Sequence, residues 1–437
     1  MNFSTSLLPY LENTEQLSIR LSELGHRVAL ESSNFEHPNG RWSIISAAPI
    51  ESLELTDKTS LTSVLTKVHN LSKVLPKVDS SLPFCGGLIG HISYDLGIEK
   101  VQTAQNTSLP LLLCGLYTWA YLIDHQKKET TLVYWSEVSQ ISKRHLENIF
   151  IESTNTQSKN QSNFSLLKPF SPKWDKAEYK NKIDKIHNYI LNGDTYQVNL
   201  AQSFSTKYEG DSIYAFSALK NAAKVPLACF FESESWSFAS ATPELFLQLD
   251  DDIIRTKPIK GTRPRLKNKE ADQQQILDLK NSIKDKAENL MIVDLLRNDL
   301  SKNASNVKVE SLFEVESFST VHHLVSTITA NIESNNSIQL LIDAFPGGSI
   351  TGAPKKRAME IIAELEQAPR SFYCGSTFYL SSNNKMNSNI LIRGFLFNEG
   401  EVTCWAGGGI VADSKWEDEY QESLDKISKL MRALSNQ

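Results

Sequence analysis

The segment Pro258-Ile259-Lys260-Gly261-Thr262 places a lysine where a buried strand is predicted to break at a glycine. A lysine amine is a nucleophile only when it is unprotonated, and desolvation or a nearby cation lowers the pKa of such an amine from its usual value of about 10.4. Most lysines are simply solvated cations. Four further cations lie within a few residues of Lys260, and they favour a chemical role: Arg255, Lys257, Arg263 and Arg265.

A carboxylate stands one predicted strand-turn-strand step before this lysine, at Glu244 in the segment Ala241–Leu247. The spacing predicts that Glu244 and Lys260 lie side by side on adjacent antiparallel strands. An acid beside an amine nucleophile suits the expulsion of a hydroxyl group, because hydroxide leaves well only when it is protonated. A structural ion pair explains the same spacing equally well.

Three more carboxylates belong to two predicted helices. Glu288 lies within residues 281–300, whereas Glu419 and Glu422 share one face of residues 416–434 through their three-residue spacing. Such carboxylates usually lie at the solvated edge of a helix. If both helices face one cavity, they form an oxygen-only site that favours Mg²⁺ over zinc.

Two glycine-rich segments and a histidine pair complete the candidate chemistry. Residues 347–358 are expected to open a helix, with Thr351 as its N-cap and Pro354 in its first turn, where free N–H groups can hold an anion. Residues 406–413 let a ligand approach the backbone closely. Of His322 and His323, one is expected to be packed and hydrogen-bonded and the other to touch a substrate.

The composition predicts a globular protein with a large core. The chain has 437 residues, of which 40% are hydrophobic and 22% charged, and a formal net charge of -6. This acidic balance argues against a general nucleic-acid surface. An odd number of scattered cysteines makes a disulfide framework unlikely and favours a reducing cytoplasm. They are Cys85, Cys114, Cys229, Cys374 and Cys404.

No membrane segment is expected. The N-terminus lacks the charged and apolar regions of a secretory signal. The most apolar stretch, residues 109–123, is too short to span a bilayer as a helix and is broken by Pro110 and Gly115. It therefore predicts a buried strand or a pair of strands.

The remaining pattern predicts an α+β fold with large antiparallel sheets and helices packed outside them. Polar residues 152–163 are typical of a linker, so we expect an N-terminal region (1–150), a linker (151–173) and a C-terminal region (174–437). Tyr179, Ile183, Ile186 and Ile190 recur at helical spacing before a stop at Gly193. Strands are predicted at 27–32, 41–46, 86–94, 130–135, 228–233, 236–241 and 245–249, and helices at 281–300, 352–367 and 416–434.

Taken in order, many segments of this chain resemble the chorismate-utilising enzyme family. They are GDTYQVNLAQ from Gly193, ATPELFL, PIKGTRPR, AENLMIVDLLRND, VHHLVSTIT, FPGGSITGAPKKRAMEII, YCG, ILIRG, WAGGGIVADS and EYQESLDK. The resemblance covers nearly all of the chain after Asp175 and extends to ALESS at Ala29 and PFCGGLIGHISYDLG at Pro83. It implies a sandwich-like core of antiparallel sheets surrounded by helices, as in anthranilate synthase component I.

Within this family, a lysine at the position of Lys260 is typical of the branch that aminates chorismate, whereas the anthranilate-forming branch has alanine there. The resemblance implies that Lys260 attacks C2 of chorismate while Glu244 protonates the departing C4 hydroxyl. Ammonia then attacks C4 and releases the lysine. The implied product is 4-amino-4-deoxychorismate, made by a transaminase-type amination (EC class 2.6.1) on the route to p-aminobenzoate and folate.

The same resemblance assigns the remaining site residues. Glu288 and Glu422 match Mg²⁺ ligands, with Glu419 as a water-mediated partner. Chorismate is a dianion, so cations, Mg²⁺ and backbone N–H donors are the groups it requires. The implied substrate contacts are Thr262, His323, Tyr373, Arg393, Gly407, Gly408 and Gly409, with Lys355 at the rim.

Two partners follow from the resemblance, and two alternatives stay open. No segment resembles a class I glutamine amidotransferase, and Cys85 lacks a nucleophile elbow, so a separate glutaminase subunit is expected to supply ammonia. Ser32 resembles a family contact to tryptophan, although a buried serine at a strand end explains it as simply. The alternatives are an anthranilate synthase component I and a non-catalytic tryptophan-binding subunit.

Overall fold

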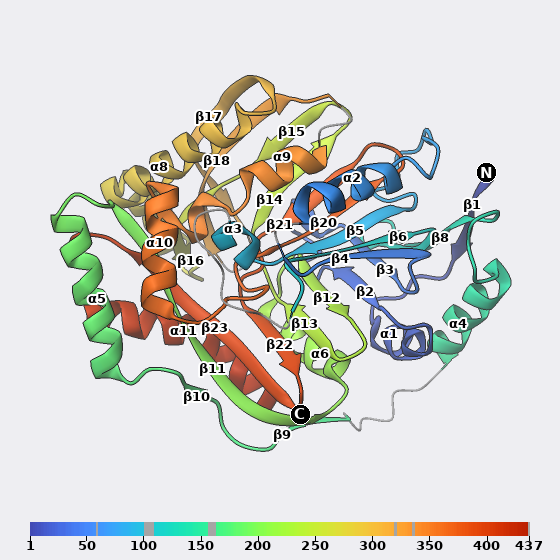
Figure 1. The fold of residues 1–437 in the computed structure, drawn as a ribbon, viewed down its shortest axis with the longest axis horizontal. Coiled ribbons are helices and arrows are strands. Elements are labelled where there is room, and N and C mark those ends of the chain that lie inside the picture. The colour runs from blue at the N-terminus through green and yellow to red at the C-terminus, as the bar shows by residue number, and fades with distance from the viewer. Residues whose placement is uncertain (58–59, 100–108, 156–162, 319–320, 334–336, 436–437) are drawn as a thin grey trace.

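The computed structural model describes residues 1–57, 60–99, 109–155, 163–318, 321–333 and 337–435. Within these residues the chain folds into two antiparallel sheets with helices around them (Figure 1). Each sheet takes strands from both the N-terminal and the C-terminal part of the chain. The α+β class predicted from the sequence is confirmed.

The first sheet has 13 strands in the described residues. Strands β9 (Phe164–Leu166) and β19 (Gly352–Ala353) pair with β11 beside its main order. That order is β1 (Phe3–Leu8), β8 (Glu129–Trp135), β7 (Trp119–Asp124), β3 (Trp42–Ser46), β2 (Val28–Glu31), β12 (Ala228–Glu232), β13 (Trp236–Ser240), β22 (Gly394–Asn398), β23 (Glu401–Ile410), β11 (Gln197–Gly210) and β10 (Ser171–Pro172).

The second sheet has 10 strands in the same residues, and β17 (Ser305–Ser317) pairs with β18 beside its main order. That order is β16 (Ile259–Pro264), β18 (Val321–Asn331), β15 (Ile253–Thr256), β14 (Leu245–Asp250), β21 (Met386–Asn389), β20 (Ser376–Ser381), β5 (Gly87–Ile92), β6 (Leu112–Tyr117) and β4 (Glu51–Leu55).

The helices cover both sheets. Helices α6 and α11 pack against the first sheet, and α7 and α8 against the second. Figure 1 shows α1 and α4 at the N-terminal end of the molecule, away from α5, α8 and α10. The bounds are α1 (Glu15–Arg20), α2 (Leu61–Leu71), α3 (Asp95–Glu99), α4 (Lys143–Asn155), α5 (Lys176–Leu191), α6 (Ser212–Ala223), α7 (Lys269–Asn281), α8 (Ile283–Leu300), α9 (Ser337–Ala344), α10 (Lys355–Glu366) and α11 (Trp416–Ser435).

Local sequence explains several of these elements directly. Helix α5 begins where the Asp175 side chain accepts the N–H of Glu178, and it buries Tyr179, Ile183 and Ile186, as its apolar spacing predicts. The apolar stretch 109–123 forms a pair of strands, β6 and β7, buried along their whole length. The two strands do not form a hairpin, because β6 belongs to the second sheet and β7 to the first.

Three details differ from the sequence predictions. Residues 152–155 complete α4, and β9 and β10 pair with β11, so much of the predicted linker 151–173 is ordered; residues 156–162 lie outside the described chain. Helix α10 begins at Lys355 after Pro354 as N-cap, because Gly352 and Ala353 pair with β11. The side chain of Thr351 instead donates to the carbonyl of Gly347.

The five cysteines are all free and buried, as their scattered positions predict. Among the described residues, no helix combines the length and the apolar character needed to cross a membrane.

Candidate active site

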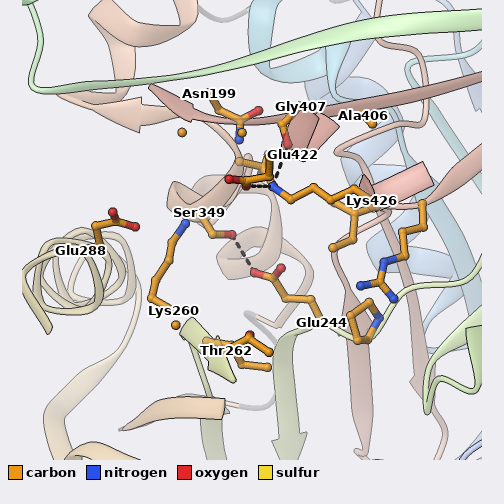
Figure 2. A pocket seen from close by; sticks show the side chains of 18 of the residues that line it. Asn199, Glu244, Lys260, Thr262, Glu288, Ser349, Ala406, Gly407, Glu422 and Lys426 are labelled. Atoms are coloured by element: carbon orange, nitrogen blue, oxygen red, sulfur yellow. Dashed lines mark hydrogen bonds and ion pairs between the residues drawn. The ribbon is translucent and has the colours of Figure 1, made fainter. Parts of the chain in front are cut away.

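A cavity of about 590 Å³ lies between the C-terminal parts of both sheets, α8 and α11. Nearly all of the residues assigned from the sequence meet there (Figure 2). From that set the lining contains Glu244, Lys260, Thr262, Glu288, His323, Tyr373, Arg393, Gly407, Gly408, Gly409, Glu419 and Glu422.

Lys260 owes its position to a β-bulge in β16. Ile259 pairs with Val325 and Thr262 with His323, so β16 carries one residue more than its partner across this interval. Such a bulge re-aims a side chain. Gly261 has φ +85°, and a Cβ there would lie 2.8 Å from Asp285 Cγ on α8, so glycine suits the turn. Within the described chain the Lys260 ammonium has no hydrogen-bond or ion-pair partner, and it extends into the cavity.

Glu244 lies just before β14 with its backbone held at two points. Its N–H donates to Thr242 Oγ1, and its carbonyl accepts the N–H of Ile390. Ser349 Oγ donates to Glu244 Oε1 at 2.7 Å. Burial raises the pKa of Glu244, and the Ser349 hydrogen bond and nearby cations only partly offset this effect. A raised pKa suits a proton donor.

The predicted neighbourhood of Glu244 and Lys260 arises in a different way from the one expected. Strand β16 pairs with β18 and not with β14. The hairpin of β14 and β15 pairs Gln248 with Arg255. Glu244 and Lys260 line the same cavity, and the charge of Lys260 acts to lower the pKa of Glu244.

The cations flanking Lys260 are largely engaged elsewhere. Arg255 lies on β15, outside the cavity lining. The other three form ion pairs, of which only the first faces the cavity: Arg263 with Asp285, Lys257 with Glu316 and Arg265 with Asp272. Of the four cations near Lys260 in sequence, only Arg263 also lines the cavity, and it is paired with Asp285.

The two adjacent histidines have different surroundings. His322 is buried, and its ring contacts Ser317 Oγ and Asp272 Oδ1. His323 lines the cavity, where its Nδ1 lies 2.9 Å from Thr262 Oγ1 on the paired strand. Burial, and secondarily the charge of Arg393, lower the pKa of His323 to about 4, so its ring is neutral at neutral pH.

Tyr373 and Arg393 form a further wall. Tyr373 is buried and stacks on Trp405 with ring centroids 5.9 Å apart. Arg393 has no hydrogen-bond or ion-pair partner within the described residues, and burial lowers its pKa. An unpaired guanidinium in a cavity is suited to bind a carboxylate.

The carboxylates of α11 lie over the glycine strand β23. Glu419 is only 8% exposed, and its Oε2 has no hydrogen-bond partner, while Oε1 accepts from Ser414. A Cβ on Gly408 would lie 3.0 Å from Glu419 Oε2 and 3.3 Å from Glu422 Oε1. The missing side chain thus leaves a small space edged by carboxylate oxygens, which fits a hard cation such as Mg²⁺.

Glu288 is half-buried on α8 and faces the cavity from the wall opposite Glu422 (Figure 2). In the described parts of the chain, no three histidine, cysteine or acidic side chains converge into a ready metal cluster. The structure thus brings the three predicted carboxylates to one cavity. Only Glu419 and Glu422 both lie close to Gly408.

Two predicted site residues lie elsewhere. Lys355 is absent from the described lining, because its ammonium contacts Asp299 on α8 and the carbonyl of Ala344. The structure thus places Lys355 outside the described pocket lining, and not at the pocket rim as expected from the sequence. Ser32 is buried after β2, and its Oγ accepts the N–H of Asn34, which is the strand-end role considered from the sequence.

Sequence reasoning missed three lining residues that had a detectable signal. Lys426 follows Glu422 by one helical turn and therefore shares its face. Ser349 lies within the glycine-rich segment, and Asn199 lies within the first family-like segment, where its Oδ1 is unpartnered. Figure 2 shows Lys426 and Asn199 beside the glycine strand.

A second cavity, of about 290 Å³, lies between the N-terminal strands and β14, β20 and β21. Its lining includes Glu31, Arg41 and Lys385. Each of these charged side chains is paired: Glu31 with Lys220, Arg41 with Asp124 and Lys385 with Asp250.

Known proteins are similar to this chain over most of its length. Residues 29–432 match the family model described as chorismate binding enzyme. The chain is 42% identical to aminodeoxychorismate synthase component 1 of Salmonella typhimurium, over 95% of this chain and 94% of that protein. It is 41% identical to the protein of the same name from Escherichia coli, with the same coverage of both chains.

A solved structure shares the fold. The crystal structure of anthranilate synthase component I from Streptococcus pneumoniae superposes with a TM-score of 0.78 at 27% sequence identity. The alignment covers 90% of this chain and 92% of that one.

Proposed function

Because the chain belongs to the family of chorismate-binding enzymes, we propose that it aminates chorismate at C4 to form 4-amino-4-deoxychorismate. The observation that carries this proposal is the Lys260 ammonium, which has no partner among the described residues and shares a cavity with the half-buried acid Glu244. The relatives named aminodeoxychorismate synthase component 1 support the same activity.

The proposed reaction proceeds in two displacements. The neutral amine of Lys260 forms a bond to C2, both ring double bonds shift by one position, and the C4–O bond breaks. Glu244 gives its proton to the departing oxygen, so that water leaves. Ammonia then forms a bond to C4, both double bonds shift back, the C2–N bond breaks, and the surplus proton on the new amine returns to Glu244. Chorismate and ammonia are thereby converted into the aminated product and water.

The cavity supplies the groups that a dianionic substrate requires. Arg393 offers a guanidinium that has no partner among the described residues, and Thr262 and the neutral His323 offer hydrogen bonds on the adjoining wall. We assign Glu288, Glu419 and Glu422 to hold Mg²⁺. When bound, this ion neutralises a substrate carboxylate and fixes its position.

The ammonia is proposed to come from a glutamine-hydrolysing partner subunit. Glutaminase chemistry in the family's partner class needs a reactive thiolate, whereas all five cysteines here are buried and free. Burial also raises the pKa of Cys85. The isolated chain should therefore use ammonium but not glutamine, and adding the partner should restore the use of glutamine.

The test combines product analysis with detection of the covalent intermediate. With chorismate, Mg²⁺ and ammonium, the chain should form the aminated product and retain the enolpyruvyl group. With ammonia omitted, Lys260 should gain the mass of chorismate minus water, mapped to the peptide that contains residues 258–262. Lys260→Ala should lose this adduct.

Other outcomes identify the alternatives. Release of pyruvate together with anthranilate would assign the chain to the anthranilate-forming branch. Tryptophan binding without any turnover of chorismate would indicate a non-catalytic subunit. A wild-type rate in Lys260→Ala would overturn the covalent step.

A further inference from the structure

The ammonium of Lys426 lies at the cation-binding side of the active cavity. Its Nζ is 2.5 Å from Glu422 Oε1 and 2.9 Å from the carbonyl oxygen of Gly407 (Figure 2). Lys426 and Glu422 are one turn apart on α11, so both side chains reach the glycine strand from the same face of the helix.

Three charged groups surround the space in front of Gly408. A Cβ on this glycine would lie 3.0 Å from Glu419 Oε2, 3.3 Å from Glu422 Oε1 and 3.7 Å from Lys426 Nζ. Carboxylate and backbone carbonyl oxygens are the ligands that Mg²⁺ accepts. The lysine ammonium thus contacts the same kind of oxygen set that a divalent cation would use.

We propose that Lys426 and a divalent cation compete for Glu422, so that Lys426 is the internal counter-ion of the metal-free site. Lys426 leaves Glu422 when the cation binds, and its ammonium then faces the cavity as an additional positive group toward the substrate. This inference rests on the metal assignment within the proposed function.

The surroundings allow such an exchange. Both side chains are accessible, with Lys426 43% and Glu422 52% exposed, so their ion pair is screened and weak. The lysine stem is long and flexible, which lets the ammonium move while α11 stays in place. A positive charge this close to the site also repels a divalent cation, so removing that charge should tighten metal binding.

The test measures metal binding without turnover. Mn²⁺ is titrated into the full chain in the absence of chorismate, and free Mn²⁺ is followed by electron paramagnetic resonance. Lys426→Met should tighten the Kd for Mn²⁺ by about 3-fold to 10-fold. Lys429→Met is the matched control, because it removes the same charge from an exposed position of α11 outside the described cavity lining. It should leave the Kd unchanged.

A second measurement follows Lys426 itself. After reductive methylation with a ¹³C label, the Lys426 resonance, assigned by its loss in Lys426→Arg, should shift as Mg²⁺ is added. The Lys429 resonance should not shift. Unchanged or weaker Mn²⁺ binding in Lys426→Met, or an unmoved Lys426 resonance at saturating Mg²⁺, would overturn the competition.

Glu422→Gln separates this inference from the metal assignment. If Glu422 is a ligand, this variant should bind Mn²⁺ at least about 10-fold more weakly. Wild-type Mn²⁺ binding by Glu422→Gln would remove the metal assignment and, with it, the competition. Weakened binding by Glu422→Gln together with no effect of Lys426→Met would reject the competition alone.

Discussion

The catalytic cavity and the second cavity both contain lysine, arginine and carboxylate side chains, but they differ in how these charges are paired. In the second cavity, Glu31 contacts Lys220 at 2.5 Å and Arg41 contacts Asp124 at 2.6 Å. In the catalytic cavity, Lys260 and Arg393 have no partner within the described residues, and Glu419 Oε2 is buried without one.

Unpaired charges near or below the surface of a protein cost free energy, so a fold keeps them where a ligand compensates them. This argument supports the proposal that substrate and metal complete the groups of the first cavity. The charges of the second cavity already stabilise the fold, because they join the N-terminal strands to α6 and β7. Substitutions should accordingly affect turnover in the first cavity and stability in the second.

The largest effect is expected for Lys260→Met compared with Lys257→Met. Loss of a group that takes part directly in bond making should lower turnover by about 10²-fold to 10⁴-fold. Lys257 belongs to the same basic segment but pairs with Glu316 outside the cavity lining. Its substitution should change turnover little. Equal losses in both variants, measured as kcat with ammonium, would contradict the distinction.

Glu288→Gln tests whether both walls of the catalytic cavity serve the metal. The Mg²⁺ concentration for half-maximal activity should rise by at least about 10-fold, because a neutral amide is a poorer ligand for a hard cation. Asp294→Asn is the control, because this exposed residue of α8 pairs with Arg297. An unchanged Mg²⁺ requirement in Glu288→Gln would confine the metal to the wall formed by α11.

Arg41→Gln, in the second cavity, should lower the stability of the fold and leave turnover unchanged. Asp124 keeps the N–H bonds from Gln126 and Lys127 but loses its guanidinium partner. Because this carboxylate is buried, the free energy of unfolding should fall by about 1–3 kcal/mol. Turnover per folded molecule should stay at the wild-type value. A selective loss of kcat, with unfolding by urea unchanged, would make the second cavity part of the catalytic site.

At neutral pH, the smallest expected effect concerns His91, which contacts Thr377 in the wall of the second cavity. Burial lowers the pKa of His91 to about 3, so the fold holds the ring neutral. The unfolded chain binds the proton first, near pH 6.5. This stabilisation is therefore present above that pH and is lost as the pH falls towards 3.

His91→Gln removes this titration. Between pH 6 and pH 4, its unfolding free energy should depend on pH less steeply than that of the wild type, by about 1.4 kcal/mol per pH unit. His145→Gln, at an exposed helix position, serves as the control. Parallel pH profiles for the wild type and His91→Gln, measured by urea unfolding, would contradict this.

Much of the architecture follows from local patterns in the sequence. Helix α5 has the predicted apolar spacing and ends two residues before the predicted stop at Gly193. Strands β2, β3 and β8 begin and end within a residue or two of the predicted bounds. Ordered segments on both sides of residues 156–162 were missed, because the short strands β9 and β10 are fixed by pairing with β11 rather than by their own polar sequence.

Some features of the candidate site follow from local sequence, and others depend on contacts between distant segments. Residue types and family-like segments identified Lys260, Glu244 and the α11 carboxylates. The bulge that aims Lys260 depends on the register with β18, and Lys355 is held by Asp299 from a distant helix. Such pairings join residues far apart in sequence, and one chain without its contacts does not predict them.

Each sheet combines strands from early and late parts of the chain, and this affects folding during synthesis. Strand β2 pairs with β12 and β5 with β20, so strands of the first hundred residues wait for partners that leave the ribosome much later. Nearly 290 residues separate the start of β5 from that of β20, which takes about 15–60 s at usual rates of synthesis. During this interval the nascent chain exposes apolar strand edges, and its demand for chaperones should be greatest. A fragment that ends before β12 should remain in that state.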